Sequence, residues 1–275
     1  MWAPSALSTG VNCKRPNRTS IGTLAASVAS LVGSMRTIDV FNGDADGLCA
    51  LQQLRLAEPA SSELVTGLKR EIGLLERVVA GADARITVLD ISLDRNRTAL
   101  ERLLAAGARV RYIDHHHAGP LPAHPRLELH IEPSPALCTS LLVDQLLGGR
   151  HARWALVGAY GDNLHAVADA RARALGIGRD EAAALAELGA AINYNAYGES
   201  AADVAIHPHD LYLRLRPYVQ PLDFRAADPI VARLVQQRHD DLARAEQVAP
   251  TVTDAQHAVF ELPDAPWSRR VLGTY

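Results

Sequence analysis

The sequence predicts an α/β fold in which a doubly wound, mostly parallel sheet is followed by a helical linker and the start of a second, smaller domain. Over the first half of the chain, short runs rich in β-branched residues alternate with helical stretches. This alternation is the pattern of βαβ units with right-handed crossovers. After Asn163 the sequence becomes rich in Ala, Leu, Glu and Arg, which favour helices.

The individual elements follow from local composition and from the turn residues between them. We expect strands at residues 37–41, 64–66, 85–91, 109–113 and 127–131, the last inside a proline-rich loop. We expect helices at residues 48–56, 73–80, 94–106, 138–147, 153–160 and 229–247, and one or two more within residues 169–191. Residues 258–262 resemble a strand, and the apolar Val271 and Leu272 resemble an unpaired strand that ends without a partner.

Composition excludes several classes of protein. The chain has 275 residues and a net charge of −3, and a protein that grips long duplex nucleic acid is usually strongly basic. No run is apolar and long enough to span a membrane. The three cysteines are widely spaced and indicate no disulfide scaffold, which fits a cytoplasmic protein.

An acidic glycine turn follows the first expected strand. Asn42, Gly43, Asp44, Ala45, Asp46 and Gly47 stand between that strand and a helix. A turn of this kind can direct Asp44 and Asp46 at one cation or at two adjacent cations. The alternative is a loop with two solvated aspartates and a helix cap.

Two further aspartates follow apolar stretches. Asp90 ends the expected strand at residues 85–91, and a carboxylate there is costly to bury unless it is paired or binds a metal. Asp162 follows a run of small and apolar residues that ends in Gly161, where a glycine permits close backbone approach. Both positions favour a metal ligand.

The triplet Asp114, His115 and His116 ends the expected strand at residues 109–113. In an open α/β sheet, ligands bind outside the carboxyl ends of the strands. Aspartate and histidine are also ligands that divalent metals use. The alternative for the triplet alone is a solvated histidine-rich loop.

These four motifs, in this order, resemble the DHH phosphoesterase superfamily, and the match is to its RecJ-like and nanoRNase-like members. The resemblance covers residues 35–163 with all four motifs, and the rest more loosely. It implies two divalent ions, usually Mn²⁺ with Mg²⁺ as an alternative, bridged by a carboxylate. The implied ligands are Asp44 and Asp90 for the first ion, and Asp46, Asp90, His115 and Asp162 for the second.

The same resemblance implies that His116 contacts the scissile phosphate or acts as a general acid. Asp114 is then a residue of the catalytic set that orients the histidines. One position departs from the pattern, because relatives carry an aspartate where this chain has Asn42. Asn42 remains a candidate ligand, since an amide oxygen also binds Mn²⁺ or Mg²⁺, but more weakly.

Composition and the resemblance together suggest how the chain is divided. Residues 1–34 are expected to be a disordered extension, 35–168 the catalytic DHH domain, 169–255 a helical linker region, and 256–275 the beginning of a truncated substrate-binding domain. Arg214, Arg216 and Tyr218 in the linker are candidates to bind substrate, since arginine suits phosphate and tyrosine stacks on bases. A solvated helix face is the alternative for them.

Three functional hypotheses remain open. The leading one is a two-metal phosphoesterase that hydrolyses phosphodiester or phosphomonoester bonds in nucleotides, short oligonucleotides or single-stranded nucleic acid. The second is a polyphosphatase or pyrophosphatase, and the third is a phosphate-binding module without catalysis. The sequence leaves the oligomeric state open, a dimer included.

Overall fold

The computed structural model describes residues 35–254 and 256–274, and Met35–Tyr275 form one compact unit. The extension expected at residues 1–34 lies outside the described residues. Within the described part of the chain, no helix has the length and apolar character needed to cross a membrane. The predicted divisions at residues 168 and 255 remain predictions.

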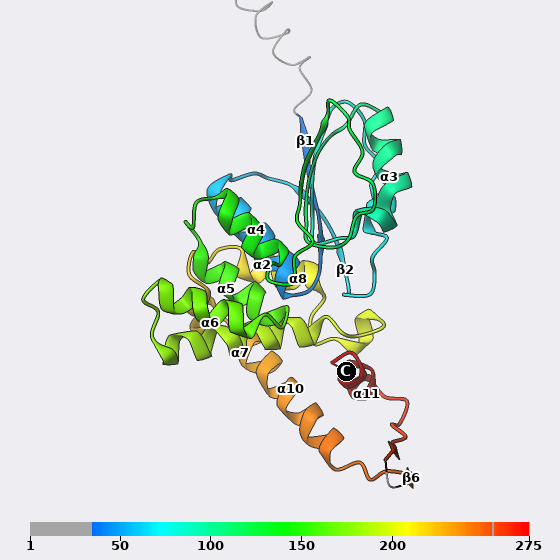
Figure 1. Cartoon of the computed structure of the whole chain (residues 1–275), viewed down its shortest axis with the longest axis vertical. Coiled ribbons are helices and arrows are strands. Elements are labelled where there is room, and N and C mark those ends of the chain that lie inside the picture. The colour runs from blue at the N-terminus through cyan, green and yellow to red at the C-terminus, as the bar shows by residue number, and fades with distance from the viewer. Residues whose placement is uncertain (1–34, 255, 275) are drawn as a thin grey trace, which may run out of the picture. The chain divides into compact units, whose positions relative to one another are not determined.

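A five-stranded sheet forms the upper part of this unit in Figure 1. Its order is β2-β1-β3-β4-β5, and every neighbouring pair is parallel. The strands are β1 (Arg36–Asn42), β2 (Glu63–Gly67), β3 (Ala84–Leu89), β4 (Arg109–Asp114) and β5 (Leu127–Ile131). The α/β class and all five of the expected strands are confirmed.

Helices cover both faces of the sheet. Figure 1 shows α3 (Leu93–Ala105) on one face, and α2 (Ala45–Ala57) with α4 (Thr139–Leu146) on the other. The stretch at residues 73–80 forms only a single 3-10 turn, η1 (Leu74–Arg77), so the helix predicted there was too long. The two layers bury two separate apolar cores, one on each side of the strands.

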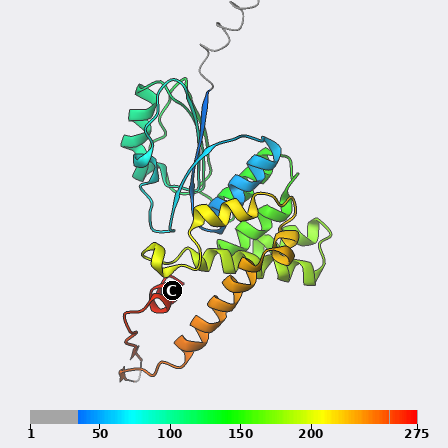
Figure 2. The same ribbon diagram turned by 180° about the vertical axis from the view of Figure 1, so that it is seen from behind.

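The second half of the described chain is helical. Here α5 (Ala152–Gly161) packs against both α2 and α7 (Arg179–Asn195), and α6 (His165–Ala174) lies between α5 and α7 in sequence. The remaining helices are α8 (Pro208–Leu215), α9 (Pro221–Ala227), α10 (Pro229–Glu246) and α11 (Pro266–Leu272), and η2 (Ala201–Asp203) is a 3-10 turn. Seen from behind in Figure 2, α10 runs away from the sheet.

The end of the chain differs from the sequence prediction. The stretch expected to be an unpaired strand at Val271 and Leu272 is the last turn of α11, and Val271 is buried. Pro266 begins this helix, at a position where the missing N–H costs nothing. The strand expected at residues 258–262 is reduced to the two residues of β7 (Ala258–Val259), which pairs with β6 (Val252–Thr253).

A buried ion pair attaches α11 to α10. The guanidinium of Arg270 donates to the carboxylate of Asp241 at 2.6 and 2.8 Å, and both side chains are buried. Tyr194 of α7 donates its hydroxyl to the same carboxylate at 3.0 Å. This charge pairing, which an apolar pattern does not show, therefore helps to hold α11 against α10.

Candidate metal centre

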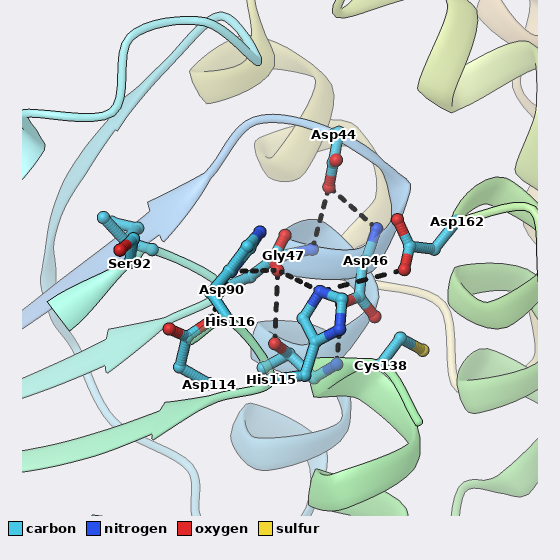
Figure 3. Close-up of polar contacts among 12 residues, drawn as sticks. Asp44, Asp46, Gly47, Asp90, Ser92, Asp114, His115, His116, Cys138 and Asp162 are labelled. Atoms are coloured by element: carbon cyan, nitrogen blue, oxygen red, sulfur yellow. Dashed lines mark hydrogen bonds and ion pairs between the residues drawn. The ribbon is translucent and has the colours of Figure 1, made fainter. Parts of the chain in front are cut away.

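The four acidic motifs meet at the carboxyl edge of the sheet. β1 ends beside Asp44, β3 beside Asp90 and β4 at Asp114. Asp162 reaches the same place from the end of α5. Figure 3 shows these side chains gathered around His115, as expected from parallel strands that end at one edge.

His115 lies at the centre of the cluster. Its Nε2 atom is 3.5 Å from Oδ1 of Asp90, 3.8 Å from Oδ2 of Asp162 and 4.0 Å from Oδ2 of Asp46. Ligands that are each about 2.1 Å from one cation lie about 3–4 Å from one another. Each of the three carboxylates therefore lies at the distance from His115 expected for two ligands of one divalent ion.

Asp90 is held in an unusual backbone conformation. Its φ is 58°, in the left-handed region that aspartate tolerates better than most residues. The side chain is buried and accepts a hydrogen bond from the Thr139 hydroxyl at 3.2 Å. Burial, followed by the nearby carboxylates of Asp46 and Asp44, raises the pKa of Asp90 well above its usual range. A cation would relieve that cost.

Asp46 is fixed by the beginning of α4. Its two carboxylate oxygens accept the backbone N–H groups of Thr139 and Ser140, both at 2.7 Å. The N-terminus of a helix favours a negative charge, so α4 stabilises this buried carboxylate. Gly158 of α5 lets the helices approach, because a Cβ there would lie 2.1 Å from Oγ of Ser140 and 3.3 Å from Oδ1 of Asp46.

Asp44 caps α2 and pairs with a lysine. Its Oδ1 accepts the backbone N–H groups of Asp46 and Gly47, at 3.0 and 3.2 Å. Its Oδ2 lies 2.6 Å from Nζ of Lys69. Burial alone would raise the pKa of Asp44, but the Lys69 ammonium and these N–H groups outweigh it and lower that pKa. The helix cap, which was the alternative hypothesis for this turn, is present.

The negative charge of Asp162 is stabilised less by the protein than that of Asp44 or Asp46. Burial, and then the carboxylates of Asp46 and Asp44, raise its pKa to about 8. The nearest positive charge is the Lys69 ammonium, 3.9 Å from Oδ1. Asp162 therefore favours the neutral form unless a cation is bound.

Asp114 orients His116. Nδ1 of His116 donates to Oδ1 of the buried Asp114 at 2.7 Å, and this hydrogen bond raises the pKa of His116. The other ring nitrogen forms no hydrogen bond among the described residues, and the His116 side chain is 43% exposed. The geometry agrees with the orienting role that the sequence suggested for Asp114.

A cavity of about 260 Å³ adjoins the cluster. Asn42 lines it, and Oδ1 of Asn42 is buried without a hydrogen-bond partner. Ser92 and Arg95, from the beginning of α3, line the other side together with His116. The lining of the cavity therefore combines an arginine and a helix N-terminus with Asp44 and Asp90 of the acidic cluster.

Arg214, Arg216 and Tyr218, the residues predicted to bind substrate, make contacts with other parts of the described chain, and their role in substrate binding stays a prediction. The side-chain amide of Gln52, late in α2, donates to the carbonyls of Arg216 and Tyr218, whereas the acidic turn is at the beginning of α2. Arg214 pairs with Asp228, and the Tyr218 ring packs against Phe224. These residues connect α8 and α9 to the far end of α2.

Sequence reasoning missed Lys69, Arg95 and Asn193. Asn193 of α7 accepts from Nζ of Lys69 at 3.1 Å, although the two are far apart in sequence. Lys69 did carry one signal, because it is the only lysine after residue 34 in a chain that otherwise uses arginine. Arg95 lies in an ordinary helical pattern, and the sequence gave no signal that it lines the site.

Comparisons with known proteins were made for both sequence and structure. Neither the family models nor the curated proteins gave a match to this chain. Among solved structures, the manganese-bound exonuclease RecJ is similar, with a TM-score of 0.50, 20% identity, and coverage of 82% of this chain and 68% of RecJ. RecJ of Thermus thermophilus in complex with Mn²⁺ aligns with a TM-score of 0.48 and 22% identity, over 82% of this chain and 39% of that one.

A third structure is the DHH domain of a protein that belongs to a family of ribosomal proteins. It gives a TM-score of 0.55 at 12% identity, and covers 88% of this chain and 67% of its own. The chain therefore has the fold of the DHH superfamily, and the resemblance seen in the sequence is confirmed at the level of the fold.

Proposed function

We propose that this protein is a divalent-metal-dependent phosphoesterase that hydrolyses nucleotides, short oligonucleotides or single-stranded nucleic acid in the cytoplasm. The observation that carries the proposal is the donor set around His115. Ligand atoms from Asp46, Asp90 and Asp162 lie within 4.0 Å of one imidazole nitrogen. Carboxylate and imidazole donors suit Mn²⁺ and Mg²⁺, and three carboxylates this close need a cation. Manganese is also the metal in the RecJ structure that shares the fold.

When bound, such an ion would supply positive charge to the phosphoryl group and lower the pKa of a nearby water. The chain's own residues position the other participants. Asp114 holds the His116 ring, and its hydrogen bond raises the pKa of that ring. His116 thus keeps its proton to a higher pH and can donate it to the leaving oxygen.

The substrate phosphate is proposed to enter the cavity beside His116. The N-terminus of α3 opens onto this cavity at Ser92, and helix N-termini favour phosphate. Arg95 adds a guanidinium, whose fork of donors matches phosphate oxygens. Nothing on this wall selects a base, so the proposal rests on recognition of the phosphodiester group.

A turnover screen tests the proposal. Purified full-length protein is incubated with Mn²⁺, with Mg²⁺ or with a chelator, on di- to pentanucleotides, a bisphosphorylated adenosine and polyphosphate. Asp90→Ala should abolish turnover and metal retention, because Asp90 is within 3.5 Å of His115 Nε2. Arg85→Ala is the matched control, since Arg85 is exposed at the beginning of the strand that Asp90 follows.

Activity on the nucleotides that depends on metal and on Asp90 supports the proposal. Hydrolysis of polyphosphate alone would instead favour the phosphoanhydride hydrolase. Metal retention without turnover of any substrate would favour the non-catalytic phosphate-binding module.

A further inference from the structure

The ammonium of Lys69 lies beside Asp44, a residue expected to hold the first of two metal ions, and near Asp162, a residue expected to hold the second. Its Nζ is 2.6 Å from Oδ2 of Asp44 and 3.9 Å from Oδ1 of Asp162. Asn42, the other candidate ligand on that side, offers only a neutral oxygen. A positive charge from the chain itself therefore occupies this end of the cluster.

Asp44 has little capacity left for a metal. One of its oxygens accepts two backbone N–H groups at the beginning of α2, and the other accepts from Lys69. Asp90 and Asp162 differ in this respect. Among the described residues, the carboxylate of Asp90 accepts only the Thr139 hydroxyl, and the carboxylate of Asp162 accepts no hydrogen bond. The free ligand atoms thus lie on the His115 side of the cluster.

Lys69 is held in place by more than its ion pair. Asn193 accepts a hydrogen bond from Nζ at 3.1 Å, and the Tyr197 ring lies beneath it with its centroid 5.5 Å away. The backbone N–H of Lys69 donates to the carbonyl of Ala196 at 3.0 Å. Residues at the end of α7 and directly after it therefore hold the Lys69 side chain in place.

The choice of lysine is informative in this chain. Lys69 is the only lysine after residue 34, where every other fixed positive charge is an arginine. An ammonium group is a compact positive charge, closer in size and shape to a metal ion than a guanidinium group, which is planar and wide. Lysine therefore suits a position where a compact positive charge fits beside two carboxylates.

We propose that Lys69 takes the place of one metal ion, so that the centre holds a single divalent cation at Asp46, Asp90, His115 and Asp162. The inference depends on one part of the proposed function, namely that these four residues form the metal site. Lys69 also keeps a donor available, because two of its three N–H groups are used by Asp44 and Asn193. The third can meet a phosphate oxygen of the substrate.

Metal counting tests the inference. Manganese retained after gel filtration in Mn²⁺ buffer is measured by mass spectrometry, and its electron paramagnetic resonance spectrum is recorded. The proteins are the wild type, Asn42→Asp, the double variant Asn42→Asp/Lys69→Met, and the control Asn42→Asp/Arg70→Met. Arg70 is the exposed neighbour, with only a 3.7 Å pair to Glu199. Circular dichroism verifies that each variant is folded.

We expect one ion per chain in the wild type, in Asn42→Asp and in the Arg70 control, with the hyperfine-split spectrum of an isolated Mn²⁺ ion. The double variant with Lys69→Met should bind two ions, and its spectrum should broaden through exchange between ions that share Asp90. Two ions in the wild type would overturn the inference, because Lys69 would then move aside. One ion in the double variant would also overturn it. Binding of no ion by the wild type would refute the proposed function itself.

Discussion

Asp162 should make the metal-free protein less stable as the pH rises. Without a bound cation, burial and the carboxylates of Asp46 and Asp44 raise its pKa from 3.8 to about 8. Between these values the folded state holds a proton that the unfolded state has released. The free energy of unfolding therefore falls as the pH rises from about 4 to about 8, and the contribution is fully present only below the lower value.

The shift sets an upper limit on this loss. About four pKa units, at about 1.4 kcal/mol each, correspond to about 6 kcal/mol. The Asp162 side chain is 21% exposed, so solvent screening reduces the cost. We expect a loss of about 2–4 kcal/mol between about pH 5 and about pH 8. Asp162→Asn should remove most of it, because the amide is neutral throughout.

Urea unfolding with a chelator at several pH values measures this loss. Asp83→Asn is the control, since Asp83 is exposed in the turn before β3. Saturating Mn²⁺ should flatten the wild-type profile, because the cation stabilises the ionised carboxylate. A metal-free wild type whose stability is constant or rises over this range would refute the reasoning. If the unfolding free energy of Asp162→Asn fell by the same amount, the loss would belong to another titrating group.

Three further predictions concern single residues. His116→Ala should retain the metal and lose turnover by roughly 10²–10⁴-fold, as expected for a general acid, and metal loss would instead identify it as a ligand. Arg95→Ala should raise KM more than it lowers kcat; steady-state kinetics with unchanged KM would remove Arg95 from the phosphate site. Gly158→Ala should lower the unfolding free energy by about 1–3 kcal/mol through the clash with Ser140, whereas Gly178→Ala, where a Cβ meets nothing within 4 Å, should not.

The sheet and its acidic edge could be predicted because both depend on local sequence. A run such as β3, followed at once by Asp90, identifies a strand and its end without reference to the rest of the chain. Parallel order then brings the ends together. The β4 triplet was placed correctly for the same reason, and Asp162 followed from the small residues at the end of α5.

Long-range packing decided what could not be predicted. Lys69 follows β2, whereas its partner Asn193 comes from the end of α7, and no sequence spacing connects them. Arg214 and Tyr218 were assigned to substrate on residue type alone. Gln52 of α2 donates a hydrogen bond to the carbonyl of Tyr218, which follows α8. The local sequence pattern does not contain this contact.

The four aspartates of the cluster, Asp44, Asp46, Asp90 and Asp162, divide into two groups by the way their negative charge is stabilised. Asp44 and Asp46 receive backbone N–H groups at the beginning of α2 and α4, so the fold itself stabilises their negative charge. The carboxylates of Asp90 and Asp162 receive no such groups among the described contacts, and the pKa of each is raised, with burial as the largest cause. The negative charge that the protein does not compensate is therefore greatest at Asp90 and Asp162, on the His115 side of the cluster, and a cation bound there would neutralise it. The same division explains why an ammonium suffices for Asp44, whereas the opposite side needs a divalent ion.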